Sequence, residues 1–168
     1  NVTNMSNAFI YALTFNQPLN NWDVSNVTNM SGMFSRAYKF NQPLNNWNVS
    51  NVTSLADTFN GALKFNQDIS TWNIGKVTNL SGTFANTVEF NQNINIWNTS
   101  KVTILSSAFK DAKAFNMPLN NWDVSKVTFM VSTFENTVNF NQPLNNWNVS
   151  KVANLFFCFN GAKAFNSD

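Results

Sequence analysis

A 25-residue unit repeats without a gap along the 168-residue chain, and this period limits the possible folds more than any other feature. The stretch 15–39, FNQPLNNWDVSNVTNMSGMFSRAYK, shows the unit once. Residues 25 positions apart form columns, and five columns keep one residue type throughout; they begin at Val2, Phe9, Phe15, Asn16 and Trp22. A fixed period of this size predicts an array in which each unit stacks on its neighbours.

The period predicts one array over residues 1–168, with six full 25-residue units and a partial seventh. The pattern starts and stops in mid-unit, so we expect a section of a longer protein, with any signal or anchor outside this segment. A formal charge of +2 is too small to indicate nucleic-acid binding. No apolar run is long enough to predict membrane insertion by this segment.

The first half of each unit has the spacing of a helical face. Val27, Met30, Phe34 and Ala37 follow one another at intervals of three, four and three. This predicts a short helix or tight helical turns over about 26–36, with an N-cap residue just before it. When the unit is counted from 26 to 50, its eleventh position holds residues that accept a left-handed backbone and so end a helix. These residues are Gly61, Asn86, Asp111, Asn136 and Gly161, whereas Tyr11 and Arg36 depart from the rule.

The second half of the unit has the spacing of a strand. Leu44-x-x-Trp47-x-Val49 matches the Leu-x-x-Leu-x-Leu strand of a leucine-rich repeat. Stacked units would place such strands about 4.8 Å apart in a parallel sheet. The predicted fold class is therefore an α/β repeat solenoid. It is a right-handed leucine-rich-repeat-like array with a parallel β-sheet on the concave face and short helices on the convex face.

The invariant columns predict the interior. Interior ladders are how repeat arrays bury surface, so we expect the Trp and Phe columns to point inward. An Asn follows the second Phe in every unit, from Asn16 to Asn166. Because buried backbone groups need hydrogen-bond partners, this column predicts an internal amide ladder in which each side chain bonds the backbone of the next unit.

The sequence pattern of the unit resembles a bacterial surface-protein repeat that is grouped with BspA-like leucine-rich repeats. The pattern is V-T-x-M/L-x-x-x-F-x-x-A-x-x-F-N-Q-P-L-x-x-W-D/N-V-S. The resemblance covers the whole chain. It implies an extracellular, cell-surface protein that acts in adhesion or host interaction. It implies no catalytic residues.

The residues that flank each Trp are expected to face outward on the concave sheet, which resembles the usual binding face of leucine-rich repeats. This candidate binding face is rich in amides and weakly charged. One hypothesis is that it binds a protein or glycan by many hydrogen bonds; the other is that Asn only fills tight strands. The residues are Asn21, Asp23, Asn46, Asn48, Thr71, Asn73, Ile96, Asn98, Asn121, Asp123, Asn146 and Asn148.

A basic column appears in the later units. A line of ammonium groups could meet an anionic polymer such as a wall or capsule polysaccharide. It could equally be a solvated edge that keeps arrays apart. The four residues of this basic column are Lys76, Lys101, Lys126 and Lys151.

An apolar flank also appears late in the chain, at positions that elsewhere hold Asn or Ser. Monomers seldom expose such a patch without reason, so it is a candidate contact with a cap, a following domain or another copy. Drift within a repetitive sequence is the alternative. The residues of this apolar flank are Ile104, Phe129, Val131, Phe156 and Phe157.

The sequence offers no catalytic constellation. It has no histidine and one cysteine, Cys158, and its eight acidic residues are scattered. We therefore expect no enzyme, no cofactor and no metal site. The predicted function is a non-enzymatic cell-surface binding or adhesion module with a protein or surface glycan as partner and no nucleic acid. The alternative is a structural spacer, sheath or filament subunit that associates with its own copies.

Overall fold

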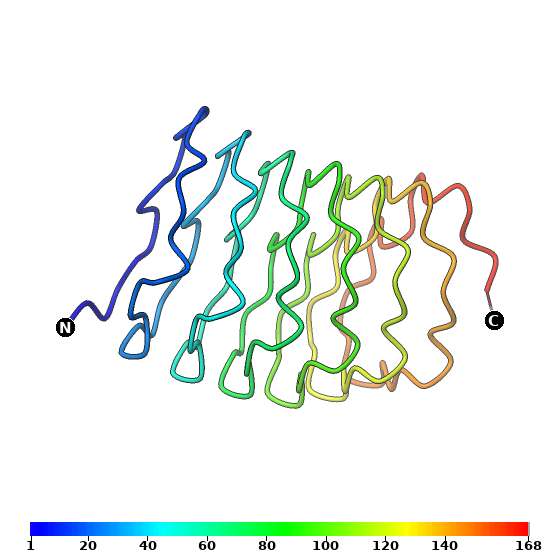
Figure 1. Cartoon of the computed structure of the whole chain (residues 1–168). Coiled ribbons are helices and arrows are strands. Elements are labelled where there is room, and N and C mark those ends of the chain that lie inside the picture. Colours follow the sequence, from blue (N-terminus) through cyan, green and yellow to red (C-terminus); the bar gives the residue numbers. More distant parts are fainter. Residues whose placement is uncertain (168) are drawn as a thin grey trace.

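The computed structural model describes residues 1–167, which form a stack of 25-residue coils. Figure 1 shows the coils side by side, with the two ends of the chain at opposite ends of the stack. One residue of each coil pairs with its equivalent in the next through an isolated parallel bridge. These residues are Asn4, Asn29, Ser54, Asn79, Ile104, Phe129 and Asn154. Within 1–167 there is no helix and no strand longer than these single bridges.

The predicted α/β leucine-rich-repeat-like solenoid is therefore wrong, because both its convex helices and its concave parallel sheet are missing from residues 1–167. What the structure does contain is the 25-residue register, since each bridge joins two equivalent positions of neighbouring coils. No helix able to span a membrane occurs in this described part.

The expected helix over 26–36 is a run of tight turns. Alternate N–H groups leave the coil: Met30 donates to Ser54 O at 3.1 Å and Phe34 donates to Thr58 O at 2.8 Å. The N–H groups between them close turns, as in the 3.1 Å bond from Met33 N to Met30 O. An α-helix would need each N–H to reach the carbonyl four residues back. Here about half of the backbone N–H groups donate to carbonyls of the next coil instead.

Two residues of each coil have a left-handed backbone, with positive φ, and these residues turn the chain within this segment. One is the predicted eleventh position, where Tyr11 and Arg36 also have φ near +58° and +59° despite their side chains. The other lies four residues earlier and was not predicted. It holds Asn7, Gly32, Asp57, Gly82, Ser107, Ser132 and Phe157. Such a backbone costs a non-glycine residue energy, so inter-coil hydrogen bonds must hold it in place.

The expected strand over 44–49 also consists of turns. Trp47 N donates to Leu44 O at 3.1 Å, and Val52 N donates to Val49 O at 2.9 Å. No backbone–backbone hydrogen bond joins 40–50 to a neighbouring coil in the described chain. Side chains make these connections instead, as in the 2.9 Å bond from Trp47 Nε1 to Leu19 O. One side of each coil is thus joined by backbone and the other by Asn and Trp side chains.

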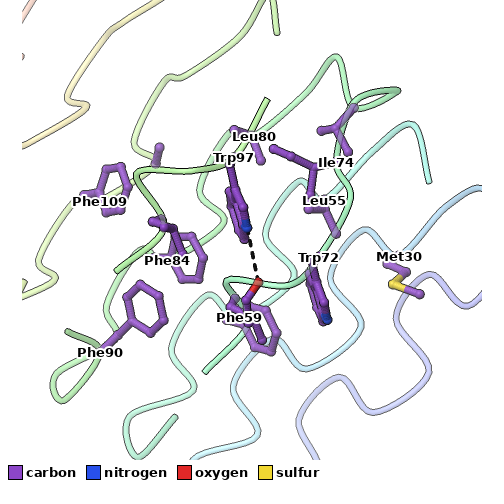
Figure 2. Packing of buried hydrophobic residues seen from close by; sticks show 14 of the residues in the cluster. Met30, Leu55, Phe59, Trp72, Ile74, Leu80, Phe84, Phe90, Trp97 and Phe109 are labelled. Atoms are coloured by element: carbon purple, nitrogen blue, oxygen red, sulfur yellow. Dashed lines mark hydrogen bonds between the residues drawn. The ribbon is translucent and has the colours of Figure 1, made fainter. Parts of the chain in front are cut away.

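The predicted interior is confirmed. The indoles of Trp47, Trp72, Trp97 and Trp122 are buried, and the central Phe columns are inaccessible to water. Neighbouring rings stack within and between coils: the centroids of Phe84 and Phe90 lie 4.1 Å apart. Figure 2 shows rings of successive coils entering one interior, with the indole N–H of Trp97 bonded to a backbone carbonyl.

The Asn ladder is confirmed, but it lies nearer the surface than predicted. Asn16 Oδ1 accepts the N–H of Asn41 at 2.9 Å, and Asn41 Oδ1 accepts the N–H of Asn66 at 3.0 Å. The same bond continues to Asn166. The members are half-buried or exposed rather than internal. This column supplies acceptors where the backbone ladder is absent.

Candidate binding surface

Four columns of outward and mostly polar residues run along the stack, and we call them together the outer polar surface. In one coil the columns pass through Thr71, Asn73, Lys76 and Thr78, and the equivalent positions of the next coil continue them. Between them the chain points Trp72, Ile74 and Val77 inward. Alternation of inward and outward residues therefore makes the surface, although turns rather than strands produce it.

All twelve residues of the predicted binding face are exposed, as expected, and they belong to this surface. Their predicted setting is wrong, because no sheet underlies them. The column of Asn21 lies at the tip of the turn closed by Trp22 N and Leu19 O, 2.9 Å apart. The column of Asp23 lies between this turn and the next. Ile96 is the one large apolar member and is 71% exposed.

The side chains in the column of Asp23 also cap backbone turns. Each of its carboxylates or amide oxygens accepts the backbone N–H two residues on, as in the 3.0 Å bond from Ser25 N to Asp23 Oδ1. The same turn recurs at Asn73 and Asn98. Hydrogen bonds from Ser25 lower the pKa of Asp23, because they favour its charged form. In the Asn members the Oδ1 is used in this way, while the amide NH₂ makes no hydrogen bond within residues 1–167.

The basic column lies at exposed turn tips beside these amides. Lys76 Nζ donates to Asn51 Oδ1 of the preceding coil at 2.7 Å. Lys101, Lys126 and Lys151 are exposed and make no hydrogen bond or ion pair with residues 1–167. Lys126 is near Asp123 and helps to lower the pKa of that carboxyl, after the hydrogen bonds from Ser125.

The Thr column completes the surface, and it was not predicted as part of it. Thr53 Oγ1 donates to Thr28 O at 3.0 Å, which also accepts the N–H of Thr53 at 2.8 Å. The same pair of bonds recurs at Thr78 and Thr103. The regular spacing of the column is visible in the sequence, but the prediction for 26–36 included Thr28 in a helical segment and not in the binding face.

The apolar flank borders the Thr column. Phe129 is 50% exposed and Phe156 is 62% exposed, while Ile104 and Val131 are half-buried. Phe157 packs on Phe156 with centroids 4.0 Å apart. Elsewhere the column of Phe129 holds residues such as Asn29, whose Oδ1 accepts the N–H of Ser31 at 2.9 Å. Phe129 replaces this turn bond with an exposed ring.

No three His, Cys, Asp or Glu side chains of 1–167 lie close enough to hold a metal ion. The two ion pairs of this part, Lys64 with Glu89 and Lys110 with Glu135, join neighbouring coils at the surface. Burial raises the pKa of the Cys158 thiol to about 11, which disfavours the reactive thiolate.

A protein-family model described as "Mycoplasma protein of unknown function, DUF285" matches the chain twice, over residues 1–79 and 65–168. The chain belongs to this family. The two matches overlap and together span the whole DUF285 array, in agreement with a repeat that runs from end to end. No curated protein and no solved structure matches the chain.

Proposed function

We propose that this DUF285 array is a non-enzymatic cell-surface module that binds a protein or glycan through its outer polar surface. The observation that carries the proposal is the register of this surface. Its four columns mostly repeat amide, hydroxyl or ammonium groups in neighbouring coils, with carboxylates at Asp23 and Asp123 and apolar residues at Ile96 and Ala153, and all members are exposed or half-buried. The bridges between coils imply a spacing of about 4.8 Å along each column.

The turn-capping hydrogen bonds order the side chains of the Asp23 column before any partner binds. The Oδ1 atoms of Asn73 and Asn98 cap their own turns, so the side chains are held in one orientation, and their NH₂ groups have no hydrogen-bond partner within residues 1–167. Side chains that are already ordered lose less entropy when a partner binds. A regular row of such donors fits an extended partner better than a compact ligand.

The cell-surface location rests on sequence resemblance. The repeat unit resembles that of BspA-like surface proteins, which act in adhesion, although the leucine-rich-repeat fold itself is absent from the described chain. We propose that the resemblance reflects a shared role at the surface. Labelling of intact cells with an antibody to the array would test it, and labelling only after lysis would contradict it.

The binding proposal is tested by exchanging Asn for Asp at Asn73, Asn98 and Asn148. Asp23 and Asp123 show that a carboxylate makes the same turn, so folding should be kept while the NH₂ donors are lost. The wild-type array and the triple variant are applied to immobilised surface polysaccharides and extracellular proteins. We expect the partner of the wild type to be bound at least about tenfold more weakly by the variant. Equal binding, or no partner at all, would contradict the proposal.

A structural role is the second candidate, because the apolar flank exposes Phe129 and Phe156. In this role copies of the array associate through the flank. Sedimentation over a range of concentrations would detect it. Phe129→Asn and Phe156→Ser introduce residues that the same columns hold elsewhere, so they should abolish association without unfolding. A monomer at all concentrations would exclude this role.

A further inference from the structure

We infer that the basic column, with the amides and hydroxyls on either side of it, binds a linear anionic polysaccharide. This inference rests on the proposed function and narrows its partner to one class. The four lysines occupy the same turn tip in four consecutive coils. At about 4.8 Å per coil they extend over roughly 15 Å, which is enough to meet several charged groups along one polymer.

The ammonium groups are available to a ligand. Lys101, Lys126 and Lys151 have no hydrogen-bond or ion-pair partner within residues 1–167, and Lys76 bonds a neutral amide. Elsewhere on the array, Lys64 and Lys110 are already paired with glutamates of neighbouring coils. The basic column thus differs from these two lysines in lacking a carboxylate across the coil boundary.

The charge is concentrated on one half of the outer polar surface. In the four coils with lysines, the surface columns contain one carboxylate, Asp123. In the preceding coils the lysine column holds Asn1, Asn26 and Asn51, and a carboxylate, Asp23, lies beside it. A polyanion would therefore be drawn to the later coils and not to the earlier ones.

The neighbours of the lysines favour a polysaccharide over a nucleic acid. Thr78 and Thr103 lie on one side of the column and Asn73 and Asn98 on the other, so hydroxyl and amide groups face a ligand along with the charges. Single-stranded nucleic acid usually stacks its bases on a row of aromatic rings. In the coils with lysines, the rings of Trp72, Trp97 and Trp122 are buried and that of Trp147 is half-buried, so no row of exposed rings runs beside these columns within residues 1–167.

The chain itself offers matched variants for the test. Replacing all four lysines by Asn copies the residue that the same column holds in the earlier coils. The reverse pair, Asn26→Lys and Asn51→Lys, would extend the row to six. Binding of heparin (sulfates) and polygalacturonate (carboxylates) is measured by titration at low and high salt, with dextran as the neutral control and oligothymidylate as the nucleic-acid control.

We expect the wild type to bind both polyanions and to lose affinity as salt rises. The four-lysine variant should bind about tenfold more weakly or worse, and the extended row should bind more tightly. Equal binding by wild type and four-lysine variant, or no binding of either polyanion at low salt, would overturn the inference. So would tighter binding of oligothymidylate than of both glycans. If the Asn-to-Asp triple variant still loses a neutral partner in any of these cases, the proposed function survives without the inference.

Discussion

Removal of the Trp72 indole tests the way in which the coils are joined. Trp72 is 3% exposed, and its Nε1 donates to Leu44 O of the preceding coil at 3.0 Å. The centroid of the Trp72 ring is 6.4 Å from the centroid of the Trp47 ring and 6.1 Å from the centroid of the Phe59 ring. The side chain therefore provides both apolar contact and the polar link that this side of the coil lacks in its backbone.

The magnitude follows from these contacts. Truncation of a buried Trp to Ala costs about 3–5 kcal/mol, which covers lost transfer energy and the cavity left behind. The hydrogen-bond share is about 1 kcal/mol, because Leu44 O still accepts the N–H of Trp47 at 3.1 Å and is not left unpaired. Trp72→Phe loses that bond but keeps most ring contacts, so it should cost less than Trp72→Ala.

Urea unfolding, followed by the fluorescence of the remaining tryptophans, measures both variants. Trp22→Ala is the matched control, since that ring is 45% exposed and its indole has no hydrogen bond within residues 1–167. We expect the free energy of unfolding to fall most for Trp72→Ala, less for Trp72→Phe and least for Trp22→Ala. Equal losses at Trp72 and Trp22 would refute the argument that inter-coil Trp contacts stabilise the stack.

Three further predictions concern single positions. Gly82→Ala should lower the unfolding free energy by more than about 1 kcal/mol, because φ is +59° and the new Cβ would collide with the carboxylate of Asp57 in the preceding coil. Gly75→Ala is the control and should cost less, since φ is not positive there. A larger loss for Gly75→Ala than for Gly82→Ala in urea unfolding would contradict this. The Cys158 thiol, with a pKa raised to about 11 by burial, should react with a maleimide far more slowly in the native array than in urea; equal rates would show that it is accessible. Hydrogen bonds from Ser125 lower the pKa of Asp123 in the folded state, so this carboxylate stabilises the fold above about pH 4 and the contribution is lost as the pH falls through the lowered pKa. Asp123→Asn keeps the turn and should weaken the pH dependence of the urea midpoint in this acid range; an unchanged dependence would contradict it.

The residues of the candidate surface could be predicted from the sequence, while their setting could not. Asn73, Lys76 and Thr78 flank inward residues, so their exposure follows from alternation alone. Alternation is the same whether the backbone is a strand or a chain of turns, and the pattern therefore did not exclude a sheet. The role of Asn73 Oδ1 as a cap for Gly75 N depends on the turn and became visible only in the structure.

The expected helix failed for a related reason. The intervals between Val27, Met30 and Phe34 suit one face of a helix, and they equally suit turns that return to the interior every third or fourth position. A second left-handed position was partly signalled by Asn7 and Gly32. Ser107 and Phe157 carry no such signal, because neighbouring coils impose their backbone on them.

The sequence by itself determined the period, the inward Trp and Phe columns and the amide ladder, since each is a choice of side chain made again in every 25-residue unit. Only the tertiary structure decided where the backbone donors go. Met30, Gly32 and Phe34 donate to the carbonyls of Ser54, Ala56 and Thr58 in the next coil. A hydrogen-bond partner in another coil leaves no trace in the local pattern, and with those donors engaged the helix expected over 26–36 cannot form. The sheet expected over 44–49 is absent because 40–50 makes no backbone–backbone hydrogen bond to a neighbouring coil in the described chain.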